Sequence, residues 1–527
     1  MAQRRHNFIS GAAVLALAVA VTKVLGALYK IPLGNLLDKE GMAHFYAAYN
    51  IYNLLLVLST AGLPLALSRL VSRAAAQGRL NAQRRIFRTA LALLAVIGLV
   101  CSAVMCLFPQ VLSGLLHDSL AAPAIRVLGP AVLFVCLTSA IRGYTQGLGD
   151  MTPTAVSQMT ESAGKLVIGL ALCLVLLHRG ADSSLCAAGA IAGVTAGSLL
   201  SLTVLTVFLL RRRDRAAVDV PPARSAVLRE LLTAGIPITL GAAGMSLITL
   251  LDQALVMSTL QNTLGYTEAA ATALYGEYTF GMTLFALPPS FIYPVTVSLV
   301  PDISAALARG DRPAAGRSAA AALKLTTLIA LPTGAGLSVL AGPILRLLYP
   351  AVPDTAAAAA YHLTILGIAC IFVCLMVATN GVLQAYGKEY IPVVTLLCGG
   401  ILKIITNYLM VGDPATNVRG APVSTLYCYG LIVVLNLIAI ARCVPERPSY
   451  LRLFARPVLI TAVMALAARS SYGLLARSLP ERWAVLPAIA VAVVVYGVLV
   501  LALGAVTRQD VLDLPKGEKI ARMLHLH

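Results

Sequence analysis

Long apolar runs recur along almost the whole chain, and short polar segments separate them. A helix needs roughly 20 mostly apolar residues to cross a bilayer, and only helices or closed barrels satisfy the backbone in lipid. Runs this long and this rich in Leu, Ala and Val predict helices and exclude a barrel. We predict fourteen spans, at residues 8–33, 44–71, 87–109, 124–145, 153–177, 184–210, 230–259, 271–300, 318–342, 357–384, 391–411, 420–441, 453–475 and 484–506.

Basic residues gather in alternate connecting segments. One set of segments, together with both termini, holds 24 Lys and Arg, whereas the opposite set holds six. The positive-inside rule therefore predicts that both termini lie in the cytoplasm. The first apolar run continues past Gly26 and is too long for the core of a signal peptide, so we expect a retained first helix.

A short motif occurs twice, 238 residues apart. It reads R-G-x-x-Q-x-x-G at 142–149 and N-G-x-x-Q-x-x-G at 380–387, at the ends of spans four and ten. The same offset carries Lys165 onto Lys403. Spans 1–6 and 7–12 thus resemble two copies of one unit, and transporters built in this way bind substrate where the copies meet.

The expected fold is an all-α polytopic membrane protein of about fourteen helices. Two pseudo-symmetric six-helix lobes are expected, and two C-terminal helices follow them. The predicted parts are a lobe at 1–210, a basic cytoplasmic linker at 211–229, a second lobe at 230–445, and the last two helices with a cytoplasmic tail at 446–527.

Composition agrees with this class of protein. Of 527 residues, 59% are hydrophobic and only 12% are charged, whereas soluble domains carry roughly 25% charged residues. The net charge of +18 is explained mostly by orientation and by contact with anionic lipid headgroups. Composition thus excludes a soluble, disordered or nucleic-acid-binding protein. The ten cysteines lie mostly in apolar runs and predict neither a disulfide framework nor a metal site.

Charged residues inside the spans are the candidate functional residues, because each costs several kcal/mol at mid-bilayer without a partner. Lys23 and Lys30 lie seven apart in the first span, on one helix face, with no acid beside them. Glu161 and Lys165 are spaced for an ion pair, although Lys165 can also line a cavity. Lys403 has no acidic partner in its own span.

Four further polar residues complete the candidate set. Asp252 and Glu277 either pair with the buried lysines or bind a coupling cation, Na⁺ or H⁺, with Asp252 the main candidate for coupling. Asn50 and Asn53 make the second span less apolar. A cationic cavity suits an anionic substrate, and ammonium groups are point-charge partners for phosphate. The predicted substrate-binding residues are Lys23, Lys30, Asn50, Asn53, Lys165, Lys403 and Glu277.

The first 70 residues resemble a known family. Residues 22–37 read TKVLGALYKIPLGNLL, and with 40–42, 48–52 and 59–64 they are similar to the stage V sporulation protein B branch of the polysaccharide biosynthesis proteins. That branch is related to the MurJ-type lipid II flippases of the multidrug/oligosaccharidyl-lipid/polysaccharide exporter superfamily. The resemblance implies fourteen helices and export of a lipid-linked cell-wall precursor by alternating access.

The resemblance also implies roles for two residues. Lys23 falls where MurJ-type flippases have a cavity arginine, and Asp252 resembles an aspartate that is linked to a sodium ion in some members. Residues 56–57 are Leu and Val where MurJ-type proteins have adjacent arginines, and no arginine stands ahead of residues 287–288. These departures fit the sporulation branch better than the MurJ branch.

Three functions are compatible with the sequence. The expected one is a flippase for a lipid-linked oligosaccharide, such as undecaprenyl-pyrophosphate-linked peptidoglycan precursor (lipid II). The alternative is a cation-coupled multidrug antiporter, whose cavity is typically acidic rather than basic. A membrane-embedded glycan polymerase usually needs a large soluble loop or clustered acids, bases or metal ligands. We therefore expect a monomeric, non-enzymatic transporter without catalytic residues, metal or resident cofactor, and with membrane lipids but no nucleic acid as partners.

Overall fold

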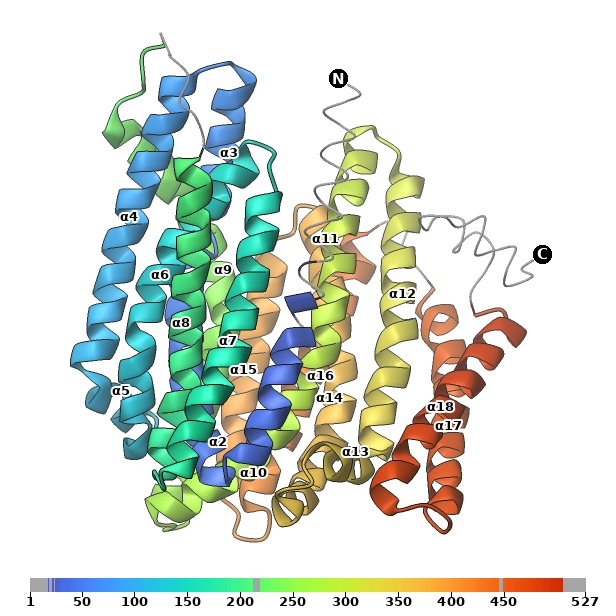
Figure 1. Cartoon of the computed structure of the whole chain (residues 1–527). Coiled ribbons are helices and arrows are strands. Elements are labelled where there is room, and N and C mark those ends of the chain that lie inside the picture. The colour runs from blue at the N-terminus through green and yellow to red at the C-terminus, as the bar shows by residue number, and fades with distance from the viewer. Residues whose placement is uncertain (1–17, 19–20, 23, 212–218, 445–448, 506–527) are drawn as a thin grey trace. The chain divides into compact units, whose positions relative to one another are not determined.

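The computed structural model describes residues 18, 21–22, 24–211, 219–444 and 449–505, and all of their regular secondary structure is helical (Figure 1). Twelve of these helices are long and apolar enough to cross a membrane. They correspond to twelve of the fourteen predicted spans, so the expectation of an all-α polytopic protein is confirmed. The first predicted span, 8–33, lies partly outside the described residues. Its described end belongs to a helix over 24–36.

The eighth predicted span is not one continuous helix. The structure divides residues 271–300 between α10 (Glu268–Phe285) and α11 (Leu287–Ala308), with a turn at Ala286. Pro288 and Pro289 lie directly after this turn, and proline removes a backbone donor and disfavours helical geometry in the residue before it. Apolarity therefore predicted helix in this segment but neither its interruption nor its end, because α11 continues to Ala308.

The second predicted span is divided in the same way. It consists of α2 (Lys39–Thr60) and α3 (Leu63–Ala76), which meet at Gly62. A side chain at Gly62 would lie 1.9 Å from the carbonyl oxygen of Gly235 in α9 (Arg224–Ser258). The hydroxyl of Thr239 also accepts a hydrogen bond from the Gly62 backbone N–H at 3.1 Å. Glycine here lets the α2–α3 turn pack directly on the α9 backbone.

The described residues form two compact units. The first comprises those within Met1–Thr279 and Asn407–Val418, and the second those within Phe280–Thr406 and Arg419–His527. These units differ from the predicted lobes because α9 packs against α2 and α3, and the lobe boundaries remain a prediction.

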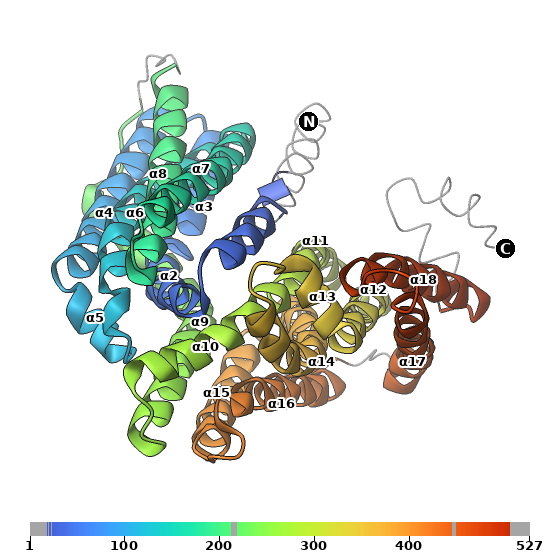
Figure 2. The same cartoon turned by 60° about the horizontal axis from the view of Figure 1, so that its bottom comes forward.

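The remaining helices follow one another along the chain, separated by short connections, as the hydrophobic pattern predicts. In the first unit they are α4 (Leu80–Leu107), α5 (Pro109–Leu115), η1 (Ser119–Ala121), α6 (Ala122–Gly147), α7 (Thr152–His178), α8 (Ser183–Leu210) and η2 (Thr259–Thr263). The later elements are α12 (Arg312–Val339), α13 (Ala341–Leu348), α14 (Pro353–Ala385), α15 (Tyr390–Val411), η3 (Asn417–Arg419), α16 (Gly420–Cys443), α17 (Tyr450–Leu475) and α18 (Glu481–Ala502). The last two helices lie side by side (Figure 2).

The predicted linker docks on the first unit. Backbone N–H groups of Asn81 and Ala82, at the start of α4, donate to the two carboxylate oxygens of Asp219 at 2.8 and 2.9 Å. Partial desolvation raises the pKa of Asp219, but these hydrogen bonds and the nearby Arg79 outweigh it and hold the pKa below its usual value. Asp219 thus caps α4 from a distant part of the chain.

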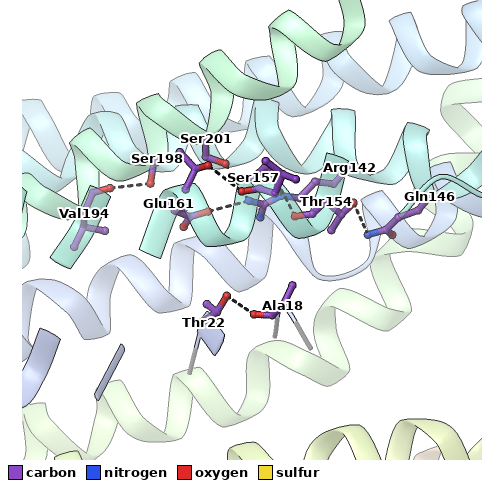
Figure 3. Close-up of polar contacts among 12 residues, drawn as sticks. Ala18, Thr22, Arg142, Gln146, Thr154, Ser157, Glu161, Val194, Ser198 and Ser201 are labelled. Atoms are coloured by element: carbon purple, nitrogen blue, oxygen red, sulfur yellow. Dashed lines mark hydrogen bonds and ion pairs between the residues drawn. The ribbon is translucent and has the colours of Figure 1, made fainter. Parts of the chain in front are cut away.

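A polar joint connects three helices of the first six-helix copy. Arg142 of α6 donates through Nε to Ser157 of α7 at 2.9 Å, and through Nη2 to Glu161 of α7 and Ser201 of α8, each at 3.0 Å (Figure 3). The planar guanidinium has five donors in a fixed arrangement, so one arginine can hold both neighbouring helices.

Three helices of the second predicted copy also meet through polar side chains, all of them uncharged. Asn436 of α16 donates through Nδ2 to Asn380 of α14 at 2.8 Å and accepts from Thr395 of α15 at 2.8 Å. Asn380 and Thr395 follow Arg142 and Ser157 by the repeat offset of 238 residues. Two positions of the repeat, Arg142/Asn380 and Ser157/Thr395, therefore both take part in polar contacts among three helices. The central residue differs, because it is Arg142 in one case and Asn436 in the other.

Candidate functional site

One face of α2 carries aromatic and amide side chains within the membrane span. Asn50 follows Tyr46 by four residues and Asn53 follows Tyr49 by four, so the two pairs run side by side along one broad helix face. Lys30, in the helix 24–36, donates from Nζ to the Tyr46 hydroxyl at 3.2 Å. The same nitrogen lies 4.6 Å from the centre of the Tyr46 ring and 5.2 Å from that of Tyr49. These contacts hold the ammonium group by cation–π attraction.

A second lysine faces the same aromatic ring. Nζ of Lys165 in α7 lies 5.9 Å from the centre of the Tyr49 ring. The structure thus brings together Lys30, Lys165 and the α2 face, which the sequence placed in three separate spans. The possible Glu161–Lys165 ion pair is not the one observed, because Glu161 pairs with Arg142. The arginine offers this carboxylate a partner whose other donors are satisfied by hydroxyls.

Two glycines of α8 contact the backbone of Lys165 and fix its position. An added Cβ at Gly193 of α8 would lie 2.3 Å from the Cα of Gly169 and 2.8 Å from the Lys165 carbonyl oxygen. One at Gly197 would lie 2.9 Å from the Lys165 backbone nitrogen. Small residues at such positions let two membrane helices approach to backbone contact. The backbone of Lys165 therefore rests directly on α8, and its side chain extends from a fixed platform.

Tyr29 fixes the helix that carries Lys30. This tyrosine is buried and donates from its hydroxyl to the carbonyl oxygen of Ala190 in α8 at 2.8 Å. Its ring also meets Phe45 of α2 edge-on, with 6.0 Å between ring centres. Because Lys30 is the next residue, anchoring Tyr29 to α8 and α2 sets where the ammonium group stands.

A small polar pocket lies farther along the same face of α2. It has a volume of about 120 Å³ and is lined by Asn50, Asn53, Met245, Ser246 and Thr249, which come from α2 and α9. The structure therefore brings the two predicted asparagines to a common pocket.

Asp252 is buried one turn beyond Thr249 on α9. Its side chain is 4% exposed, and its Oδ1 accepts a hydrogen bond at 2.6 Å from Nδ2 of Asn407, which is 1% exposed. The sequence did not single out Asn407, although it follows Lys403 by one helical turn and was visible as a polar residue in an apolar run. Among the described residues, no group of three or more His, Cys, Asp or Glu could hold a metal ion.

Glu277 is neutralised by a lysine that was not expected to reach it. Its carboxylate lies 3.0 Å from Nζ of Lys39, whose side chain is 40% exposed. A Cβ at Gly276 would lie 1.9 Å from the Lys39 carbonyl oxygen, so α10 touches the start of α2 here. Among the described residues, the ion-pair partner of Glu277 is therefore Lys39 rather than one of the lysines considered from the sequence, and this contact lies near the end of the span.

The last two predicted lysines are Lys403 and Lys23. Lys403 of α15 is 5% exposed and donates to the hydroxyl of Thr425 in α16 at 3.0 Å, within the second unit. Lys23 lies outside the described residues. Arg142 was noticed in the repeat motif, but its hydrogen bonds to α7 and α8 were missed because spacing along one helix does not show contacts between helices.

Apolar spans with lysine, amide and carboxylate side chains inside them define a multi-pass membrane transporter. The chain belongs to the polysaccharide biosynthesis protein family, whose model matches residues 8–307. A second family model, MatE, matches residues 237–409. Both place the chain in the multidrug/oligosaccharidyl-lipid/polysaccharide exporter superfamily, as the sequence resemblance predicted.

Curated relatives from Bacillus subtilis (strain 168) match most of the chain. The membrane protein YabM is 27% identical, over 99% of this chain and 97% of its own length. Stage V sporulation protein B is 24% identical over 84% and 85%, and the lipid II flippase MurJ is 24% identical over 88% and 88%.

Solved structures show the same fold. A lipid II flippase MurJ in an inward closed conformation superposes with a TM-score of 0.71 at 15% identity, covering 93% of this chain and 98% of that one. An inward-facing multidrug resistance MATE family transporter gives a TM-score of 0.64 at 15% identity, covering 84% and 98%.

Proposed function

We propose that this protein moves a lipid-linked oligosaccharide across the bacterial cytoplasmic membrane by alternating access. The substrate that fits best is an undecaprenyl-pyrophosphate-linked peptidoglycan precursor, lipid II or a related polysaccharide precursor. The observation that carries the proposal is the convergence of Lys30 and Lys165 on Tyr49, inside the membrane span. The sporulation and lipid II flippase relatives support the same class of cargo.

The charges explain why a diphosphate is the favoured headgroup. Two ammonium groups near one ring repel each other, and each loses hydration inside the span. A diphosphate carries several negative charges and compensates both ammonium groups at once, in surroundings of low dielectric constant. The hydroxyl of Tyr46 adds a hydrogen-bonding group at the same place. The lipid chain can then remain in the bilayer while the headgroup crosses.

The proposed orientation places both termini in the cytoplasm, as the distribution of basic residues predicts. The proposed driving force is a cation, Na⁺ or H⁺, bound at Asp252, or the membrane potential acting on the charged headgroup. Asp252 is suited to a cation because its carboxylate is buried in the span and accepts a hydrogen bond from the neutral amide of Asn407.

Replacing Asp252 by Asn is expected to remove the dependence of transport on the coupling cation. The substitution keeps the size of the side chain but removes the negative charge that would attract a cation. Transport by the wild type and by Asp252→Asn should be measured in proteoliposomes while the Na⁺ and proton gradients are varied separately. A variant that responds to both gradients as the wild type does would contradict a coupling role for Asp252.

A second candidate is a cation-coupled multidrug antiporter, favoured by the MatE match over residues 237–409 and by the buried Asp252. Reconstituted protein separates the two functions. We expect it to translocate a fluorescent undecaprenyl-pyrophosphate disaccharide between leaflets. We expect no transport of a lipophilic cationic dye. Efflux of the dye without translocation of the lipid would instead establish the antiporter.

A further inference from the structure

The pocket between α2 and α9 differs chemically from the lysine-binding face. Its lining consists of two amides, two hydroxyls and one thioether, and contains no ionisable side chain. Such a lining offers hydrogen-bond donors, acceptors and one apolar contact. It therefore suits a neutral polar group and not a phosphate or an ammonium ion.

Hydrogen bonds within the pocket leave specific positions open. Asn50 donates through Nδ2 to Oε1 of Gln253 at 2.7 Å. The Gln253 side chain is buried, and its Nε2 has no hydrogen-bond partner among the described residues. The hydroxyl of Thr249 donates to the Met245 carbonyl oxygen of its own helix at 3.0 Å, so its oxygen is left to accept. Gln253 does not line the pocket; through its hydrogen bond with Asn50 it holds the Asn50 amide in place.

The size and place of the pocket narrow the choice of ligand. Its volume of about 120 Å³ equals that of roughly four water molecules at about 30 Å³ each, which is enough for an acetamido group. Asn50 and Asn53 each follow one of the lysine-binding tyrosines, Tyr46 and Tyr49, by one helical turn. A turn rises about 5.4 Å, the reach from a diphosphate to the substituent on the adjoining carbon of the first sugar.

We propose that Asn50, Asn53, Ser246 and Thr249 form a subsite for the acetamido group of the sugar attached to the diphosphate. This inference rests on the proposed function and adds to it a preference for N-acetylated amino sugars. Asn53 donates to the acetamido carbonyl oxygen, Thr249 accepts from its N–H, and the methyl group lies against Met245. A sugar with a hydroxyl in place of the acetamido group leaves these partners unsatisfied.

The test uses the purified full-length protein in lipid nanodiscs and three probes. These are undecaprenyl pyrophosphate, the same lipid carrying N-acetylglucosamine, and the same lipid carrying glucose. Binding is measured by native mass spectrometry. The wild type should bind the N-acetylglucosamine lipid about 10-fold more tightly than the glucose lipid, because unpaired buried polar groups disfavour the latter. Asn53→Leu should reduce this preference to below about 3-fold.

Matched variants make the outcome decisive. Thr60→Val, also on α2, removes a hydroxyl that donates only to Leu56 of its own helix at 2.7 Å, and it should keep the full preference. Ser246→Ala provides a second, smaller change in the pocket should Asn53→Leu not fold. Equal binding of the two sugar lipids by the wild type, or an unchanged preference in both pocket variants, overturns the subsite. Failure to bind any of the three lipids overturns the proposed function itself.

Discussion

Exchange of both Lys30 and Lys165 for glutamine is expected to abolish translocation of lipid-linked pyrophosphates. Both ammonium groups lie within 6 Å of the Tyr49 ring centre, so together they form the positive region that would receive the headgroup. A hydrogen bond to a charged group contributes about 1.5–3 kcal/mol. Each single substitution should therefore weaken binding of undecaprenyl pyrophosphate by about 10- to 100-fold, and the double substitution should remove transport.

The measurement is leaflet-to-leaflet translocation of a fluorescent undecaprenyl-pyrophosphate disaccharide in proteoliposomes. Lys388→Gln is the matched control, because it removes the same charge from the turn between α14 and α15 and not from a membrane span. Lys165→Arg should retain part of the activity, since it keeps the charge while changing its geometry. Full transport by a folded Lys30→Gln/Lys165→Gln protein would exclude these lysines from headgroup binding.

Valine at position 193 is expected to remove transport and to lower the thermal stability of the protein. Even a single added carbon at Gly193 would lie 2.3 Å from Gly169 and 2.8 Å from the Lys165 carbonyl oxygen. Overpacking of a filled interior typically costs 1–3 kcal/mol, and here backbone atoms must move to relieve it. Separation of α7 from α8 would carry Lys165 away from Tyr49.

Stability in detergent and translocation in proteoliposomes should be measured for Gly193→Val and for Gly497→Val. Gly497 lies in α18, and an added carbon there meets no atom within 4 Å, so the control should behave as the wild type does. If Gly193→Val retains both its unfolding temperature and its transport rate, the close contact between α7 and α8 is not needed to position Lys165.

The hydrophobic pattern was sufficient to predict most of the fold. Apolar runs of this length have few alternatives in a membrane, so twelve predicted spans correspond to spanning helices. The pattern could not show the break at Ala286, because the two prolines that follow it are themselves compatible with a membrane span. Residue spacing detected the repeat, but only the structure shows that Arg142 and Asn380 each take part in a polar contact among three helices.

The sequence predicted the residues of the candidate site better than it predicted their contacts. The free-energy cost of a charge inside the membrane shows which residues need a partner. It does not show which partner each of them has. Spacing along α7 allowed a Glu161–Lys165 pair, whereas an arginine on α6 binds Glu161 and Lys165 faces a tyrosine on α2. Such pairings depend on how three helices pack, and a single sequence contains no direct record of that packing.

The glycine contact between α7 and α8 also restricts how this protein can change over generations. Exchange of glycine for alanine is a common route to greater stability, because it reduces the freedom of the unfolded chain. That route is closed at Gly169, Gly193 and Gly197, where no carbon atom can be added without moving the backbone. Adaptation to heat or to a new cargo must therefore arise elsewhere, on surfaces where side chains can be exchanged without disturbing the platform beneath Lys165.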